Sequence, residues 1–135
     1  MPTKLFFILS FFWLTPVFAN LKVVTTTEDL RSVTQSIGED FVDVTSIAKG
    51  TQDPHYVEAK PSFLVAVSRA DLVISIGLEL ESGWLPLLLR GARQPNLLPG
   101  EAGCLSVSEA ISPIEVLGQA DRSQGDVHPL GNPHF

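Results

Sequence analysis

The sequence predicts an α/β fold in which a parallel sheet of about four strands carries helices on both faces. Two observations support this fold class. Short apolar runs rich in β-branched residues alternate with stretches whose apolar residues recur at helical spacing, and glycine or proline separates most of these segments. A length of 135 residues, with 44% hydrophobic and 18% charged residues, is typical of one globular unit with one core.

The expected strands are short and are bounded by polar or glycine-containing segments. LKVVTTT has the β-branched density of a buried strand, and DLVISIG closes on Gly77. FVDVTSIA and GCLSVSEAI have similar character, and the second of these runs into a polar stretch. We therefore expect strands at 21–27, 41–48, 71–77 and 103–111.

Helical spacing is clearest in EDLRSVTQSIG, where Leu30, Val33 and Ile37 share one face before Gly38 ends the segment. PSFLVAVSRA has Pro61 in its first turn, which suits a helix start. GWLPLLLRGA predicts a short helix that begins or is interrupted near Pro86. The helices are expected at 28–38, 61–70 and 83–92.

The first residues, MPTKLFFILSFFWLTPVFA, have the pattern of a secretory signal peptide. Lys4 precedes an apolar run from Leu5 to Leu14, and Pro16 and Ala19 follow it. A membrane anchor needs about 18 to 20 apolar residues, and this run is roughly half that length. We expect 1–19 to be a signal peptide cleaved after Ala19, and 20–135 to form a periplasmic domain.

Charge and cysteine content narrow the class of partner. A formal net charge of −6 and the absence of any basic run argue against binding to nucleic acid. The single cysteine, Cys104, excludes an intrachain disulfide and a cysteine-based zinc cluster. Any metal ion bound by this chain would therefore have nitrogen and oxygen ligands.

All three histidines fall in loops that follow expected strands, where ligands bind in open α/β sheets, so His55 is expected to share a sheet edge with the late pair, His128 and His134. His55 lies in DPH and His134 in NPH, and the preceding proline stiffens the approach of each ring. Asp53 and Asn132 can bond nearby backbone or orient a ring. The repeated pattern favours His55 and His134 over His128 as metal ligands, although an ordinary turn also explains each motif.

Four other residues are expected to have ordinary structural roles. Glu79 and Glu81, in GLELESGW, are expected to be solvated residues at a helix entry rather than acid–base catalysts. Trp84 is expected in the core or in the wall of a cleft. Cys104 begins an apolar strand and is expected to be a buried small hydrophobe.

Two segments resemble one family of proteins, the zinc- and manganese-specific solute-binding proteins of ABC transporters (cluster A-I, lipoprotein/adhesin type). These segments are TQDPHYVEAKPSFLVAVSRADLVISIGLELESGWLPLLL and GDVHPLGNPHF. The resemblance implies that His55 and His134 coordinate a metal ion in a cleft between two α/β lobes, and it gives His128 no such role. It also implies that 20–135 is the N-terminal lobe, and that a second lobe absent from this chain supplies the remaining ligands.

The function implied is capture of a divalent transition metal, Zn2+ or Mn2+, outside the cytoplasm and its delivery to an ABC permease in the inner membrane. We expect a monomeric binding protein that is not an enzyme. A secreted zinc-dependent hydrolase with His55 and His134 as ligands is an alternative, but the chain lacks an HExxH motif. A sugar or amino-acid binder of similar fold, with incidental histidines, is a third possibility.

Overall fold

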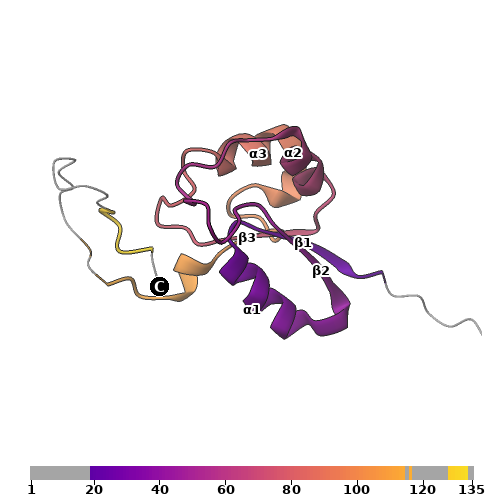
Figure 1. Ribbon diagram of the computed structural model, residues 1–135, viewed down its shortest axis with the longest axis horizontal. Coiled ribbons are helices and arrows are strands. Elements are labelled where there is room, and N and C mark those ends of the chain that lie inside the picture. Colours follow the sequence, from indigo (N-terminus) through magenta and orange to yellow (C-terminus); the bar gives the residue numbers. More distant parts are fainter. Residues whose placement is uncertain (1–18, 115, 117–127, 134–135) are drawn as a thin grey trace, which may run out of the picture.

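A computed structural model describes residues 19–114, 116 and 128–133, and these form a sheet with helices on both sides (Figure 1). The strands are β1 (Leu21–Thr25), β2 (Val42–Ser46), β3 (Leu72–Ser75) and β4 (Cys104–Ser106). The α-helices are α1 (Glu28–Gly38), α2 (Pro61–Ser68) and α3 (Leu85–Ala92). Single 3-10 turns occur at Glu39–Phe41, Pro95–Leu97 and Val107–Ala110.

All strand pairs are parallel, in the order β2-β1-β3-β4. The helix α1 connects β1 to β2 and lies on one side of the sheet, whereas α2 and α3 lie together on the other (Figure 1). The expected fold class is thereby confirmed. The strands are shorter than their apolar runs. Thr26 and Ile47 lie just beyond the ends of β1 and β2, although their amides still bond to the carbonyls of Ile74 and Thr25 in neighbouring strands.

Neighbouring residues of β1 point to opposite faces of the sheet and so divide the core in two. Val23 packs with Leu30 of α1 and with Val44. Val24 packs on the opposite face, in a larger cluster that includes Val67 of α2 and Leu88 of α3. One strand thus contributes to both layers, which is typical of a parallel sheet covered on both faces.

Helix starts follow the signals in the sequence. Thr27 caps α1, and its hydroxyl accepts a hydrogen bond from the Leu30 amide at 3.4 Å. A proline stands in the first turn of α2 and of α3, so Pro86 begins a helix and does not interrupt one. Within the described part of the chain, no helix is long and apolar enough to cross a membrane.

Glu28 links the first turn of α1 to the end of β2. Its carboxylate accepts hydrogen bonds from the Ser46 hydroxyl at 2.9 Å and from the Arg31 guanidinium at 3.0 Å. The bond from Ser46, followed by that from Arg31, lowers the pKa of Glu28 below its ordinary value. A lowered pKa means that the ionised carboxylate favours the folded state.

We expect Ser46→Ala to raise the pKa of Glu28 and to destabilise the fold at neutral pH. Because a carboxyl with a lowered folded-state pKa stabilises only while it is ionised, the difference should disappear as the pH falls through that pKa. Carboxyl titration by NMR and urea unfolding at several pH values measure both effects. Ser36→Ala, on the exposed part of α1, is the control and should leave the Glu28 titration unchanged.

Candidate metal centre

The loop that carries His55 joins β2 to α2 at the carboxyl end of the sheet. Turns form where the Gln52 amide bonds to the Lys49 carbonyl at 2.8 Å, and where the Tyr56 amide bonds to the Asp53 carbonyl at 3.2 Å. Val57 is buried in the core cluster that also contains Ile47. The loop is therefore held by two successive turns and by a core contact.

Asp53 fixes the ring of His55. One carboxylate oxygen of Asp53 lies 2.9 Å from the His55 amide nitrogen and 2.7 Å from Nδ1 of the ring. The first contact is an Asx turn, and the second assigns the proton to Nδ1. Nε2 is then the nitrogen with a lone pair, which is the form that a metal ion binds. The expectation that Asp53 orients its histidine is confirmed.

His128 lies opposite His55, although 73 residues separate them in sequence. Their Nε2 atoms are 3.1 Å apart, and the two rings stack with centroids 5.0 Å apart. The expectation that His55 shares a sheet edge with a late histidine is thus confirmed for His128. His134, the other expected ligand, lies outside the described residues and stays a prediction.

A tight turn positions His128. The Gly131 amide bonds to the His128 carbonyl at 3.2 Å, with Pro129 and Leu130 at the corner. Gly131 has a φ of 117°, and a Cβ atom there would collide with Pro113, so glycine is required. The Asn132 amide then bonds to the Ile114 carbonyl at 3.0 Å, which holds the turn against the chain that leaves β4.

Trp84 forms the wall of a pocket beside His55. The indole is only 3% exposed, and its Nε1 donates a hydrogen bond of 2.8 Å to the Pro54 carbonyl. A pocket of about 380 Å³ is lined by residues of the His55 loop and of the turn before α3: His55, Tyr56, Val57, Glu58, Gly83 and Trp84. The expectation that Trp84 belongs to the core or a cleft wall is confirmed.

Glu81 is buried, and the expectation that it is a solvated residue is wrong. It is 3% exposed, and its carboxylate accepts hydrogen bonds from the Thr26 hydroxyl at 2.6 Å and from the amides of Ile76 at 2.9 Å and Gly77 at 3.1 Å. Glu79 is exposed, as expected. The two glutamates of GLELESGW are only two residues apart but lie in different environments. Thr26, which donates a hydrogen bond to Glu81, lies 55 residues away in the sequence.

The turn that precedes Glu81 has an unfavourable backbone. Leu78 and Glu79 have φ values of 53° and 68°, in the left-handed region that costs about 1–2 kcal/mol for a residue with a side chain. Gly77, at φ 88°, adopts this region without that cost. The bonds from Ile76 and Gly77 to Glu81 hold the turn in this conformation.

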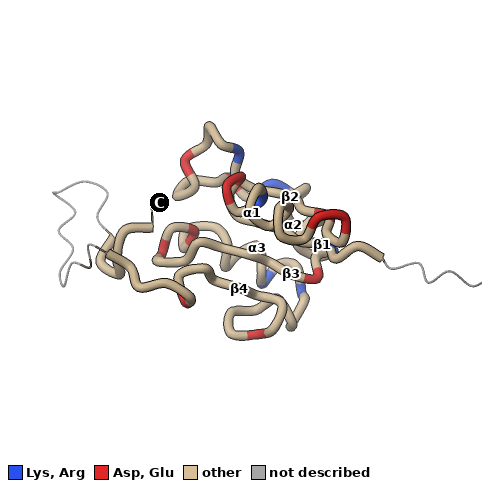
Figure 2. The backbone as a smooth tube through the Cα atoms, turned by 90° about the horizontal axis from the view of Figure 1, so that it is seen from below, with Lys and Arg blue, Asp and Glu red and all other residues tan. Residues whose placement is uncertain are grey.

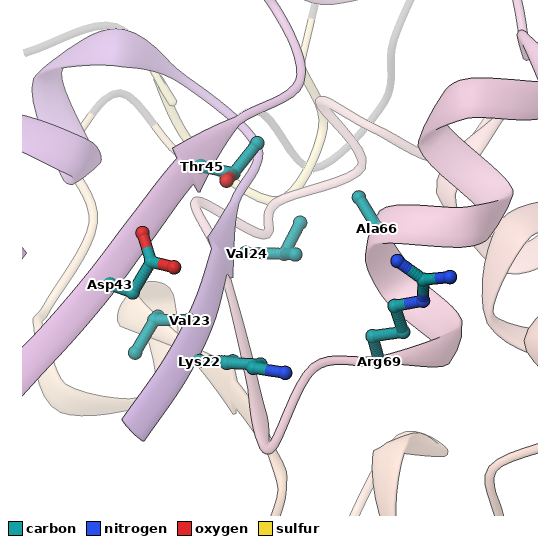
Figure 3. Close-up of a pocket in the computed structure, with 7 residues that line it drawn as sticks. All are labelled: Lys22, Val23, Val24, Asp43, Thr45, Ala66 and Arg69. Atoms are coloured by element: carbon teal, nitrogen blue, oxygen red, sulfur yellow. The ribbon is translucent and has the colours of Figure 1, made fainter. Parts of the chain in front are cut away.

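A second pocket, of about 260 Å³, lies between β1, β2 and α2 (Figure 3). Its charged groups are Lys22, Asp43 and Arg69, and it contains no histidine. Across the described chain, acidic and basic positions are spread over several elements (Figure 2). Charge alone therefore does not define a cation site, and the histidine loops remain the better candidate.

Cys104 is half-buried and packs against the core cluster between the sheet and α2 and α3. Burial, with a smaller effect of the Glu109 charge, raises the pKa of its thiol. The thiol therefore stays protonated at neutral pH and is a poor metal ligand. Among the residues that the structure describes, no group of three or more His, Cys, Asp or Glu side chains gathers around one point.

Comparison with known proteins identifies the family. Residues 23–135 match the sequence profile described as "Zinc-uptake complex component A periplasmic" (ZnuA). The chain belongs to this family. Among curated relatives, the manganese ABC transporter substrate-binding lipoprotein PsaA of Streptococcus anginosus is 32% identical over 80% of this chain. The metal ABC transporter substrate-binding lipoprotein SsaB of Streptococcus sanguinis is 30% identical over 82% of it.

Solved structures of similar sequence have the same fold. A Mn-bound periplasmic metal binding protein from Candidatus Liberibacter asiaticus superposes with a TM-score of 0.62 at 27% identity, covering 85% of this chain. A crystal structure of ZnuA superposes with a TM-score of 0.56 at 29% identity, covering 72%. This chain spans 38% and 35% of those chains, and 35% of both curated relatives.

We expect Glu81→Gln to destabilise the fold by about 1–3 kcal/mol, because an amide NH2 replaces an acceptor oxygen and leaves a buried donor unpaired. Urea unfolding measures the change. Glu79→Gln is the matched control, since Glu79 is exposed two residues away, and it should change stability by less than about 0.5 kcal/mol. Equal effects of the two variants would contradict the importance assigned to the Glu81 carboxylate.

Proposed function

We propose that this chain captures a divalent transition-metal ion outside the cytoplasm, with His55 and His134 as ligands, for delivery to an ABC permease. The observation that carries the proposal is the His55 ring, whose Nδ1 is held by Asp53 and whose Nε2 is presented at the carboxyl edge of the sheet. The relatives support it, since PsaA and SsaB are named as substrate-binding lipoproteins of manganese or metal ABC transporters.

Binding without catalysis is the better-supported activity. The relatives' names describe transport proteins, and a metallohydrolase would need a general base placed beside a metal-bound water. Zinc and manganese are the metals that the comparisons support, because similar solved structures are described as Mn-bound or zinc-bound. Two histidines leave a tetrahedral ion two ligands short, so further ligands or water must complete the shell.

Isothermal titration calorimetry with Zn2+ tests the ligand assignment. We expect His55→Ala and His134→Ala each to lose most of the zinc binding of the chain that begins at Asn20, because each removes one of two proposed protein ligands. Gln52→Ala is the matched control: Gln52 is exposed in the same loop and does not line the pocket beside His55, so its loss should change affinity little. Zinc binding that survives loss of either histidine would contradict the proposal.

Export is tested separately from metal binding. If the Lys4, Leu5 to Leu14 and Ala19 pattern is a cleavable signal, protein recovered from a periplasmic extract should begin at Asn20. N-terminal sequencing or intact-mass measurement decides this. Recovery of an intact N-terminus from the membrane fraction would overturn the export proposal without affecting the ligand assignment.

A further inference from the structure

We propose that His128 binds a divalent transition-metal ion together with His55, and that this pair of imidazoles favours zinc over manganese. The inference rests on the proposed function, because it adds a ligand to the same site and selects between its two candidate metals. Neither the DPH and NPH pattern nor the family resemblance gave His128 this role. The proposal comes from the geometry of the two rings.

The distance between the two Nε2 atoms is close to that required around one ion. Two nitrogens bound to tetrahedral zinc at about 2.0–2.1 Å are about 3.3 Å apart. His55 and His128 present their Nε2 atoms at 3.1 Å, with ring centroids 5.0 Å apart. A small movement of either ring would place both nitrogens at bonding distance from the same ion.

The protonation states are compatible with shared coordination. Asp53 holds the proton of His55 on Nδ1, so His55 Nε2 accepts and His128 Nε2 donates in the contact between the rings. When an ion enters, the His128 proton leaves Nε2 and, for a neutral ring, occupies Nδ1 instead. Both imidazoles then remain neutral and each offers one lone pair.

The position of His128 is set by the backbone before any ion arrives. The Gly131 amide donates a hydrogen bond to the His128 carbonyl and closes the turn. The amide of the next residue, Asn132, donates to the Ile114 carbonyl. Pro133 is fully buried beyond the turn. A ligand held in this way loses little conformational freedom on binding, which favours affinity.

The chemistry of the pair selects the metal. Imidazole nitrogen suits zinc, whereas carboxylate and carbonyl oxygens suit manganese. One Asp53 oxygen accepts hydrogen bonds from both the ring Nδ1 and the backbone amide of His55, so Asp53 orients the ring. With His128 added, the described part of the site offers two nitrogens to the ion.

The test compares His128→Gln with the unmodified chain that begins at Asn20, using zinc and manganese titrations and zinc-edge X-ray absorption. Glutamine can still donate a hydrogen bond to His55, but its amide nitrogen has no lone pair available for a metal. Since losing a partner that only orients a ligand already costs about 10–100-fold in affinity, loss of a ligand should weaken zinc binding by at least about tenfold. Manganese binding should change less, and the imidazole count at zinc should fall by one.

Two comparisons keep the outcome interpretable. Leu130→Ala, in the same turn and half-exposed, should leave zinc affinity unchanged, and fluorescence of Trp84, the sole tryptophan after residue 19, checks that each variant is folded. If His128→Gln has the same zinc affinity and the same number of imidazoles at zinc as the unmodified chain, the role of His128 is overturned. If His55→Ala still abolishes binding in that case, the proposed function stands. Unchanged zinc binding in His55→Ala and His134→Ala would overturn the proposed function, and this inference with it.

Discussion

The buried carboxylate of Glu81 holds together the edge of the sheet on which the candidate metal centre is built. A buried charge is costly unless it is fully hydrogen-bonded, and Glu81 accepts bonds from the chain after β1 and from the chain after β3. Its own carbonyl accepts from the Leu85 amide at 3.0 Å, which begins α3. One residue therefore fixes the ends of two strands relative to a helix.

A short series of contacts connects Glu81 to His55. The start of α3 positions Trp84, whose indole bonds to the Pro54 carbonyl, and the next residue along the chain is His55. Asp53 then sets the tautomer of the ring. Orientation of the imidazole thus depends on hydrogen bonds made by residues that need not touch a metal ion, a common arrangement around metal ligands.

Local signals in the sequence were sufficient for the presence and order of the helices and strands but not for every end: the strand expected at 103–111 covers only Cys104–Ser106, and a 3-10 turn follows at Val107–Ala110. The periodicity of Leu30, Val33 and Ile37 and the prolines of α2 and α3 act within a few residues, so their structural effects follow from nearby chemistry. The DPH motif likewise predicted the Asp53 and His55 contact, because an Asx turn spans only two residues.

The features that the sequence did not reveal depend on contacts between distant residues. The partners of Glu81 include Thr26, 55 residues away, and His128 meets His55 across 73 residues. Nothing in GLELESGW indicates which residues the fold brings beside Glu81, and HPLGNPHF predicted only a shared sheet edge with His55, not the direct contact between His55 and His128. Strand order, which places β1 and β3 side by side and so makes the Glu81 contacts possible, is also not encoded in any one segment.

The bond between Trp84 and Pro54 has a consequence for how this loop can diverge among homologous genes. Trp84 binds a main-chain carbonyl, which every amino acid has, so the identity of the residue at 54 is not fixed by this contact. The indole donor has no such freedom, since no other side chain of similar size and shape offers an N–H there. This contact therefore allows substitution at position 54 in the loop but restricts substitution at position 84, before α3.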